Sequence, residues 1–573
     1  MKELAARTVV IGSGCAGLNA ADWLAALCED DFILITENML SGTSRNTGSD
    51  KQTYYKLSLA GDEGDSVGSL AATLKQADVD GDIALCEAAG SAQCFFKLVQ
   101  LGVPFPFNSM GEYVGYQTDH DVYRRASSAG PLTSRYMTEA LESSVRNRGI
   151  TILDHTLAFR ILTDDNGVCG LQCLDTIDRT FTTIRCAHII LATGGPAAIY
   201  RDRVYPVSQS GMSGMAFEIG AKGANLDCWQ YGLASVQFRW NVSGSYQQAL
   251  PRYVSVDEAG YEYDFLSESM TLAQKLNNSF LKGYQWPFDP RRAEGSSRID
   301  MLVKAQEDLG RRVYLDYRRN PTGYSLDALS DESRNYLVNC GATQDTPIKR
   351  LRAINAPAIE LYQSNGIALQ KEMLEVRVCA QHHNGGIAVD SNWQSSIPGL
   401  YACGEAAGTF GQYRPGGAAL NSTQVGSMRA SVHIAKTSRR TVPFAAPKDA
   451  PLLLPAGDAE KLIAELQGLM THYASFVREK HGICRLLSRL DELERDVIPA
   501  STEDNQLLHR LRLRDIAITQ RQVLNAMLHA IDSKEPGVLE TCRGQCRRRP
   551  ARPLPDRDLW FERVWQKYRS ENM

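Results

Sequence analysis

A glycine-rich turn near the start of the chain constrains its fold more than any other feature. Residues 7–11 (RTVVI) predict a short buried strand, the turn Gly12-Ser13-Gly14-Cys15-Ala16-Gly17 follows, and LNAADWLAAL has helical spacing. A second apolar run, DFILITEN, then ends in Glu37 and Asn38. In such a unit the glycines let the backbone turn tightly and approach a pyrophosphate, and the helix N-terminus attracts its charge. Glu37 stands where a carboxylate can accept bonds from ribose hydroxyls, so the unit predicts a dinucleotide site.

The composition is that of an ordinary globular chain. Its 573 residues predict three or four domains or sub-domains, and its 43% hydrophobic and 22% charged residues argue against disorder and coiled coil. The formal net charge of −4 gives no global reason to expect nucleic acid or an acidic membrane surface. The basic run CRRRPARP (546–553) predicts a solvated or internally paired surface rather than a polyanion site.

The cysteines and the first residues bear on the compartment and on metal binding. The 14 cysteines are scattered in mostly apolar contexts, as in a reducing cytoplasm. Cys542 and Cys546 lie four residues apart, as do Cys169 and Cys173 in an apolar stretch. Neither spacing completes a zinc or cluster site, so we expect no metal site. The chain reaches a strand almost at once and has no long apolar run. We therefore expect no secretory signal, no membrane span and a cytoplasmic location.

Two later motifs indicate which dinucleotide is bound. Residues 187–195 (AHIILATGG) and 399–408 (GLYACGEAAG) both predict a strand that runs into a glycine-containing turn. The stretch 414–420 (RPGGAAL) follows and leads into a helix. A nucleotide supported by the start, middle and late chain favours FAD, which lies extended across a sheet. A second fingerprint for NAD(P)H is missing from the sequence.

With these motifs in order, the chain resembles the succinate dehydrogenase, fumarate reductase and L-aspartate oxidase flavoprotein family. The segments that carry the resemblance, besides those above, are SGTSRNTGSDKQ (41–52), FFKLVQLGVPF (95–105), HHNGGIAVD (382–390) and ETCRGQC (540–546). The family implies an α/β chain. Its Rossmann-like FAD-binding domain has a central parallel sheet plus a β-meander, and an inserted α+β capping domain and a C-terminal helical region complete it. The boundaries expected here are 1–205 and 379–437 for the FAD-binding domain, 206–378 for the cap and 438–573 for the helical region.

The resemblance also implies which residues contact FAD. They fall in the first glycine-rich turn, after the second strand, in the loop beside the flavin and in the late motifs: Gly12, Gly14, Ala16, Gly17, Glu37, Asn38, Ser44, Gly48, Ser49, Gly194, Gly195, Gly404, Glu405, Ala419 and Leu420. Respiratory members attach FAD covalently through a histidine in a Ser-His-Thr stretch. This chain has Ser44-Arg45-Asn46 there, so we expect non-covalent FAD.

Two arginines match the family's catalytic positions. Arg298 stands nearest to the cap arginine that delivers a proton in the family, although its acidic neighbour is displaced to Asp300. The alternative for Arg298 is a surface residue at a helix start. Arg414 matches the arginine that grips a substrate carboxylate, a role that suits a planar guanidinium.

Departures from the family pattern argue against its usual substrates. Gly232 and Ala234 replace the His and Thr of a cap stretch, and Gln381 stands in place of a second His. The loss of side chains that hydrogen-bond a substrate can reduce an enzyme's preference for that substrate by several powers of ten. We therefore do not expect succinate, fumarate or aspartate as the natural substrate. His382 and His383 either form an acid/base pair or are structural beside a tight Gly-Gly turn.

Other cap and loop residues leave two interpretations each. Lys51 could polarise the flavin or bind an anion, or it could be solvated. The stretch 238–253, with Tyr246, Gln247, Arg252 and Tyr253, indicates either a larger polar or aromatic-stacked substrate or ordinary cap core.

Two functions fit these features. The first is an FAD-dependent oxidoreductase that moves a hydride between flavin N5 and a C–C or C–N bond of an anionic, carboxylate-bearing small molecule. Arg298, Arg414 and residues 381–383 would line its site. The alternative is the flavoprotein subunit of an electron-transfer complex with an iron–sulfur partner, since the chain has no cluster-binding cysteine spacing of its own.

Overall fold

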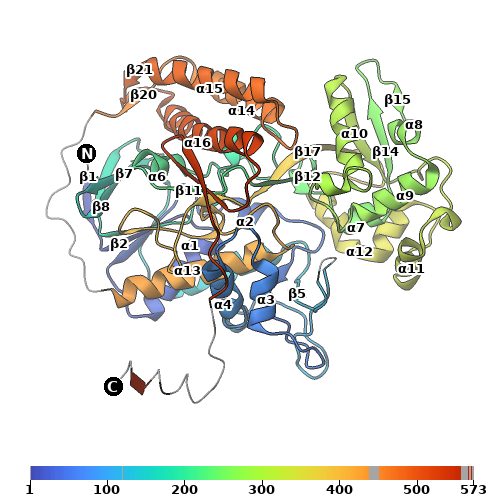
Figure 1. Ribbon diagram of the computed structural model, residues 1–573, viewed down its shortest axis with the longest axis horizontal. Helices are drawn as coiled ribbons and strands as arrows, with labels where there is room; N and C mark the ends of the chain where they lie inside the picture. The colour runs from blue at the N-terminus through green and yellow to red at the C-terminus, as the bar shows by residue number, and fades with distance from the viewer. Residues whose placement is uncertain (1, 119–120, 438–450, 556–565, 567–568, 571–573) are drawn as a thin grey trace.

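A five-stranded parallel sheet forms the centre of the FAD-binding domain. The computed structural model describes residues 2–118, 121–437, 451–555, 566 and 569–570. The sheet order is β19 (Leu400–Ala402), β10 (His188–Leu191), β2 (Thr8–Ile11), β3 (Phe32–Ile35) and β6 (Ile152–Leu153), and all neighbouring strands are parallel. These strands are almost wholly apolar because helices cover the sheet. Among them, α1 (Cys15–Ala26) packs against α13 (Ala418–Lys436) (Figure 1).

A second sheet of the same domain contains the expected meander. The strands β7 (Thr156–Asp164), β8 (Gly167–Asp175) and β9 (Phe181–Arg185) pair antiparallel in sequence order, and β1 (Lys2–Ala5) joins β9 in parallel. The predicted combination of parallel sheet and β-meander is confirmed. The remaining elements of this domain are α2 (Thr43–Asn46), β4 (Tyr54–Tyr55), α3 (Val67–Leu74), α4 (Gly81–Gln100), β5 (Ala126–Ser127), α5 (Thr133–Asn147), η1 (Ala197–Ile199), α6 (Gly214–Glu218) and η4 (Gly404–Ala406).

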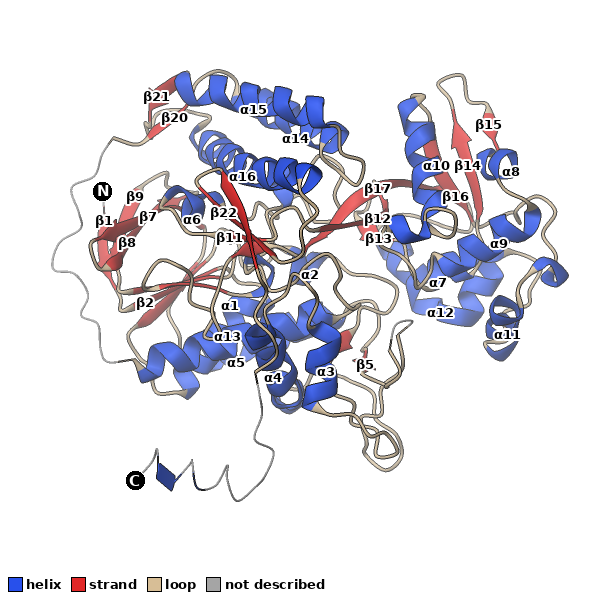
Figure 2. Cartoon of the chain, in the orientation of Figure 1, coloured by secondary structure: helices blue, strands red, loops and turns tan. Residues whose placement is uncertain are grey.

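The cap is built on a six-stranded antiparallel sheet. Its order is β13 (Trp240–Asn241), β12 (Trp229–Ser235), β17 (Leu374–His383), β16 (Arg312–Asp316), β14 (Arg252–Val256) and β15 (Glu262–Tyr263). The paired strands β12 and β17 run from the FAD-binding domain into the cap (Figure 2). The cap helices are α7 (Ser245–Gln248), α8 (Phe265–Ser269), α9 (Leu272–Leu281), η2 (Pro290–Arg292), α10 (Ser297–Asp308), η3 (Leu326–Ala328), α11 (Asp331–Asn339) and α12 (Pro347–Ser364).

The C-terminal region is mainly helical, as expected. Its start at 438 falls among residues outside the described part. The helices α14 (Ala459–Tyr473), α15 (Lys480–Arg495) and α16 (Leu507–Asp532) pack together, and β20 (Leu453–Pro455) pairs with β21 (Val497–Pro499). The hairpin β22 (Val538–Cys542) and β23 (Gln545–Arg549) joins β11 (Gly223–Ala224) and β18 (Gly386–Ile387) in one sheet.

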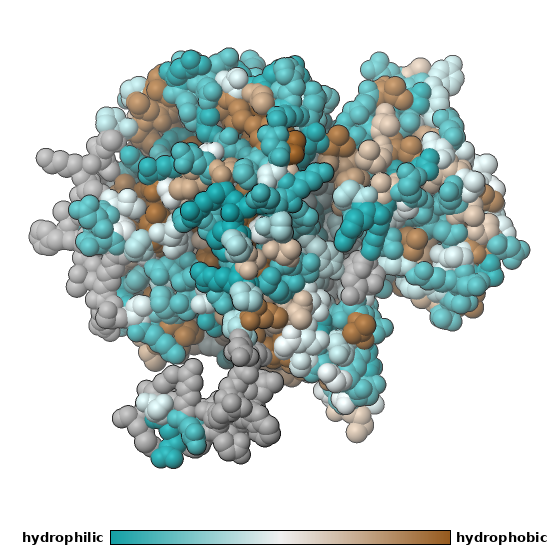
Figure 3. All heavy atoms as spheres, in the orientation of Figure 1, coloured by the Kyte–Doolittle hydropathy of each residue, from teal (hydrophilic) through white to brown (hydrophobic). Residues whose placement is uncertain are grey.

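Internal pairing accounts for much of the basic run in this hairpin. Arg547 and Arg549 both bond to Glu540, and Arg549 also bonds to Asp80 at the start of α4. The predicted paired surface is therefore confirmed at these residues. The face shown in Figure 3 is mostly hydrophilic. Among the described helices, none combines the length and apolar character needed to cross a bilayer.

Candidate active site

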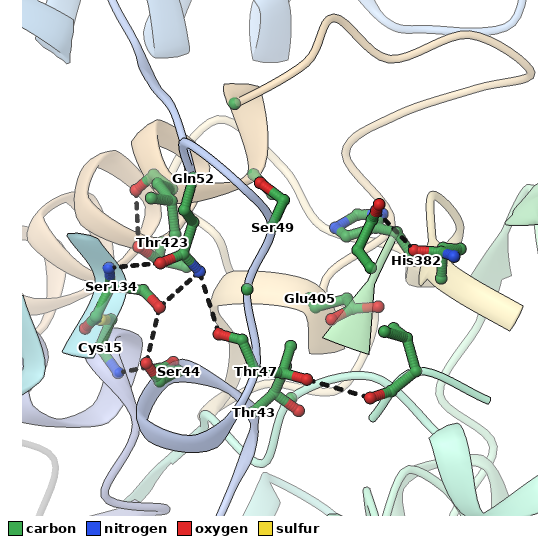
Figure 4. A pocket seen from close by; sticks show the side chains of 18 of the residues that line it. Cys15, Thr43, Ser44, Thr47, Ser49, Gln52, Ser134, His382, Glu405 and Thr423 are labelled. Atoms are coloured by element: carbon green, nitrogen blue, oxygen red, sulfur yellow. Dashed lines mark hydrogen bonds between the residues drawn. The ribbon is translucent and has the colours of Figure 1, made fainter. Parts of the chain in front are cut away.

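A cavity of about 990 Å³ lies where the FAD-binding domain meets the cap. Its walls include the glycine-rich turn after β2, the loop 41–53, the start of α13 and cap segments around 241–248 and 280–287. The parallel strands present their carboxyl ends there, which is where ligands bind in open α/β sheets. Figure 4 shows side chains of the glycine-rich turn, the loop 41–53 and α13, such as Cys15, Ser49 and Thr423, around this cavity together with His382 and Glu405.

The turn after β2 is shaped for a phosphate group. Gly12 has a φ of +111°, and a Cβ on it would overlap the carbonyl oxygen of Ala192. A Cβ on Gly17 would overlap the carbonyl oxygen of Gly12, so helix α1 can approach the turn only because both residues are glycine. Gly14 begins α1 without a side-chain cap, and the first turn holds no acidic residue. The helix N-terminus can therefore receive a pyrophosphate, and these residues fit FAD.

Most of the expected FAD contacts line this cavity. They are Gly12, Gly14, Ala16, Glu37, Ser44, Gly48, Ser49, Gly194, Gly404, Glu405, Ala419 and Leu420. Gly17, Asn38 and Gly195 lie outside the lining. Two of them contact residues of the lining. The Asn38 carbonyl accepts a hydrogen bond from the Ser41 hydroxyl at 2.8 Å, and Gly195, which has no side chain, leaves room for the Glu405 carboxylate.

Glu37 has a partner that local sequence reasoning did not find. Arg512 of α16 forms an ion pair with the Glu37 carboxylate, and 475 residues separate the two in the chain. The C-terminal helical region thus contacts the acidic residue expected to hold the ribose. No spacing rule could have linked them, because only the packing of α16 brings them together.

Hydrogen bonds hold the loop beside the expected flavin position. The Cys15 N–H donates to Ser44 Oγ at 3.2 Å, and the Ser134 hydroxyl donates to the Ser44 carbonyl at 2.6 Å. Gln52 exchanges two bonds with Ser134, one from its Nε2 at 2.6 Å and one to its Oε1 at 2.8 Å (Figure 4). Arg45, at the position of the family's attachment histidine, forms an ion pair with Glu142 at 2.6 Å.

Arg414 places a buried positive charge in the wall of the cavity. Its Nε and Nη2 donate to Gln230 Oε1 at 3.0 and 2.7 Å, and its Nη1 donates to the Pro415 carbonyl at 3.1 Å. Both acceptors are neutral. Burial lowers the pKa of Arg414 to about 10, which leaves the guanidinium charged near neutral pH. The charges of Glu405 and Glu87 oppose this lowering only in part, so a buried cation whose hydrogen bonds go to neutral oxygens favours an anionic ligand.

Glu405 is a partly buried acid in the wall of the same cavity. It accepts hydrogen bonds from the Tyr205 hydroxyl and, at 2.7 Å, from the His383 N–H. Burial raises the pKa of Glu405 to about 7, and these two bonds oppose that rise.

The three residues 381–383 have different environments. The Gln381 amide donates to the Gly232 carbonyl at 2.9 Å and accepts from Asn241 at 2.7 Å. Gln381 and His382 line the cavity, whereas His383 lies behind it. The His383 ring stacks on Trp229 with centroids 4.2 Å apart, and its Nε2 bonds the Leu226 carbonyl. Of the two alternatives for this pair, His383 thus has the structural environment.

The orientation of His382 follows from its neighbour. The Asn384 amide nitrogen donates to the Gly411 carbonyl at 2.8 Å, which leaves its oxygen to accept from His382 Nδ1 at 2.9 Å. The imidazole therefore carries its proton on Nδ1 and keeps a lone pair on Nε2. Burial holds the pKa of His382 well below its usual range, and the charge of Arg414 lowers it further. The ring is neutral at ordinary pH.

The structure does not bring Arg298 to this cavity. It lies on α10, where its Nη2 donates to the Ser269 carbonyl at 2.9 Å and its Nη1 faces Glu294 at 3.4 Å. About a third of the side chain is exposed. The neighbouring Asp300 is instead buried against Lys282. Arg298 is therefore not among the residues that line the cavity, and its guanidinium is held by Ser269 and Glu294 instead.

Aromatic residues line the cavity at positions that the sequence did not single out. Tyr246, Gln247 and Tyr253, from the stretch 238–253, are buried in the cap core, so the core interpretation holds for them. The aromatic lining comes from Tyr116, Phe280, Tyr284, Trp286, Tyr336 and Tyr413. Lys51 also lines the cavity and is exposed.

Comparisons with known proteins agree with this geometry. Residues 7–420 match the FAD binding domain family. L-aspartate oxidase of Agrobacterium fabrum is 28% identical over 503 residues, which cover 86% of this chain and 84% of that protein. A chain of the fumarate reductase (CoM/CoB) of Methanothermobacter marburgensis is 25% identical over 72% of this chain and 71% of that protein.

Solved structures show the same fold. Sdh1 of Mycobacterium smegmatis, at 17% identity, superposes with a TM-score of 0.74 over 99% of this chain and 98% of that chain. The quinol fumarate reductase chain FrdA of E. coli, also at 17% identity, gives 0.70 over 97% and 98%.

The protein is therefore a flavoprotein of the two-domain, capped type. It belongs to the FAD binding domain family, and it is an FAD-dependent oxidoreductase of the group that includes L-aspartate oxidases and fumarate reductase flavoproteins.

Proposed function

We propose that this enzyme moves a hydride between FAD and a C–C or C–N bond of a small substrate that carries a carboxylate, with Arg414 as the anion-binding residue. The observation that carries the proposal is the buried guanidinium of Arg414, which lines the cavity and donates its hydrogen bonds to the neutral oxygens of Gln230 and Pro415. A planar, permanently charged group of this kind suits bidentate binding of a carboxylate.

His382 is the proposed proton-transfer residue. FAD, when bound, supplies hydride acceptance or donation. The imidazole of His382 lines the cavity, and its Nδ1 bond to Asn384 holds the ring in place and leaves the lone pair on Nε2. Nε2 can therefore accept a proton from the substrate in dehydrogenation, and the same atom returns the proton in reduction.

The start of α13 completes the site. Gly417 has a φ of +88° and begins this helix, and Ala419 and Leu420 line the cavity in its first turn. The positive end of the helix dipole stabilises negative charge that develops nearby. We propose that this turn faces the flavin ring system.

We also propose that FAD is held without a covalent bond. Arg45 stands at the position where respiratory relatives carry the attachment histidine, and its guanidinium is engaged by Glu142. Acid precipitation should leave the flavin in the supernatant. Flavin that remains with the precipitated chain would contradict this proposal.

The substrate differs from the family's dicarboxylates. Gly232 offers no side chain at one expected polar anchor, and the Gln381 amide is bonded to Gly232, Leu233 and Asn241. Several relatives are L-aspartate oxidases by name, which keeps an α-amino acid among the substrate classes to test.

The two arginines provide a matched test. Arg414→Gln should lower kcat/KM at least about 100-fold with FAD still bound, because the carboxylate loses its charged anchor. Arg298→Gln should leave turnover near the wild-type level, because that side chain lies outside the cavity. Equal losses in both variants, or none in Arg414→Gln, would reject the assignment.

A second candidate function remains the flavoprotein component of an electron-transfer complex. What supports it is the similarity to a protein that is named as one chain of a fumarate reductase. Purification of the native protein under mild conditions tests it: an iron–sulfur polypeptide in constant ratio to flavin supports the complex, and a chain that turns over alone argues for the first function.

A further inference from the structure

Trp286 occupies the space beside Gly232 in the wall of the cavity. A Cβ on Gly232 would lie 3.0 Å from the Trp286 carbonyl oxygen and 3.1 Å from Cε3 of the indole. The Gly232 carbonyl accepts from Gln381, so the strand cannot easily move away. The absence of a side chain at 232 thus lets the indole pack against the strand and line the cavity.

Trp286 lies near the anion-binding residue. Gln230, which accepts two bonds from Arg414, is two residues before Gly232 on β12. At about 3.3 Å per residue, the two positions are roughly 6–7 Å apart along the strand. A ligand whose carboxylate contacts Arg414 can therefore place a ring-sized group against the indole.

The cap contributes further aromatic residues to the lining of the cavity. Phe280, Tyr284 and Tyr336 line the cavity with Trp286. The Tyr336 hydroxyl donates to Gln248 at 2.9 Å, and the Tyr284 hydroxyl donates to Glu332. Hydroxyl groups bonded within the cap leave the ring surfaces as the contact that these residues can offer to a ligand.

The charges of the cavity do not favour a second carboxylate. Asp50 and Glu332 line it, and like charges repel an additional anionic group; Asp121 lines it as well but is paired with Arg125. Lys51 lines it as well, but its side chain is exposed and follows the buried Asp50. A buried cation beside aromatic walls suits a monocarboxylate better than a dicarboxylate.

We propose that the substrate is a monocarboxylate with a planar, aromatic-sized group, and that Trp286 is the residue that selects it. This inference rests on the proposed function, because it uses Arg414 as the carboxylate anchor. It adds the substrate class and a specificity-determining residue.

The test compares three acids that differ in one group at a time. Cinnamate carries a phenyl ring, crotonate has a methyl group in its place, and fumarate has a second carboxylate there. Binding to the oxidised holoenzyme is measured by the change in the flavin absorption spectrum on titration. We expect cinnamate to bind at least about tenfold more tightly than crotonate or fumarate.

Variants then locate the preference. Trp286→Ala should remove the advantage of cinnamate over crotonate, and Trp286→Phe should keep most of it, because a ring remains. Arg298→Gln should leave the cinnamate affinity unchanged, because that residue does not line the cavity. If Trp286→Ala does not fold, the preference of the wild-type holoenzyme among the three acids still decides the substrate class.

The outcomes separate this inference from the proposed function. Tighter binding of fumarate that is lost in Lys51→Ala would overturn the planar monocarboxylate and leave the Arg414 anchor intact. Equal binding of cinnamate and crotonate would overturn the role of Trp286. If none of the acids binds and Arg414→Gln turns over normally, both proposals fail.

Discussion

The two walls of the cavity follow from the sequence in different ways. The FAD-binding wall is made largely of backbone. Gly17 packs directly against the carbonyl oxygen of Gly12, and α1 begins without a side-chain cap. The cap wall is made of side chains such as Trp286 and Tyr336, which come from separate segments. Most of the contacts expected on the first wall line the cavity, whereas the cap arginine expected on the second does not.

The difference shows what a local motif can encode. A turn of fixed backbone conformation needs particular residues at particular spacings, so its identity is readable within a few positions. The wall of a substrate pocket consists of side chains from distant parts of the chain. The phase of each helix and the register of each strand determine which of these side chains point into the pocket. Arg298 stands nearest to the family position in sequence, but its guanidinium bonds the Ser269 carbonyl and it does not line the cavity.

The largest effect should follow from a change on the backbone wall. Gly17→Ala places a methyl group over the Gly12 carbonyl oxygen, and backbone atoms cannot move aside as a flexible side chain can. We expect a loss of about 3 kcal/mol or more in the free energy of unfolding and loss of bound FAD. Thermal unfolding and the flavin-to-protein ratio measure the two effects.

Gly468→Ala is the matched control. This glycine lies in α14 with no atom within 4 Å of an added Cβ, so the variant should be more stable by about 0.5–1 kcal/mol. Full flavin content and an unchanged unfolding midpoint in Gly17→Ala would show that the backbone wall is less constrained than its geometry indicates.

An intermediate effect should follow from a change at His382, which lines the cavity. Because a base must be deprotonated to act, the lowered pKa of His382 should place the acid limb of kcat/KM below pH 6.5, the usual histidine range. His382→Gln should remove that limb and slow dehydrogenation about 100-fold. Rate measurements across pH with saturating flavin check this.

A change at the adjacent His383 is the control that distinguishes a catalytic effect from a packing effect. His383→Gln should retain the acid limb, because its ring is stacked on Trp229 behind the cavity, and should lower the unfolding midpoint instead. A limb near pH 6.5 that survives in His382→Gln would mean that another group accepts the proton.

The smallest effect should follow from the contact between the backbone wall and the C-terminal region. Arg512 offsets the charge of Glu37, which would otherwise repel the pyrophosphate of FAD. Arg512→Ala should weaken FAD binding about fivefold, as the loss of a partly exposed ion pair worth about 1 kcal/mol implies.

Arg514→Ala provides the comparison for this variant. Arg514 lies on the same helix and pairs with Glu218, which is not part of the cavity lining. Its loss should leave the flavin affinity unchanged. FAD titration of the two apoproteins by fluorescence quenching measures the difference, and equal affinities would show that Arg512 does not act on the cofactor site.

Much of the fold could be predicted because its signals are local. The strand–turn–helix unit that begins with β2 and the C-terminal helices each have a turn or a periodicity of their own, whereas the meander was implied by the family resemblance. Two kinds of feature could not be read this way. Glu37 and Arg512 pair across 475 residues, and Trp286 contacts Gly232 through packing between a loop and a strand.

The sequence by itself therefore determined the cofactor, the enzyme class and the arginine proposed to bind the anion. These depend on backbone geometry or on one residue within a motif. Only the tertiary structure decided which of the candidate residues line the cavity: His382 does, whereas Arg298 and His383 do not. It also decided that the indole of Trp286 fills the space beside Gly232. The physical reason is that a cofactor cradle is a local conformation, whereas a substrate pocket is a meeting of side chains whose positions depend on the packing of the whole chain.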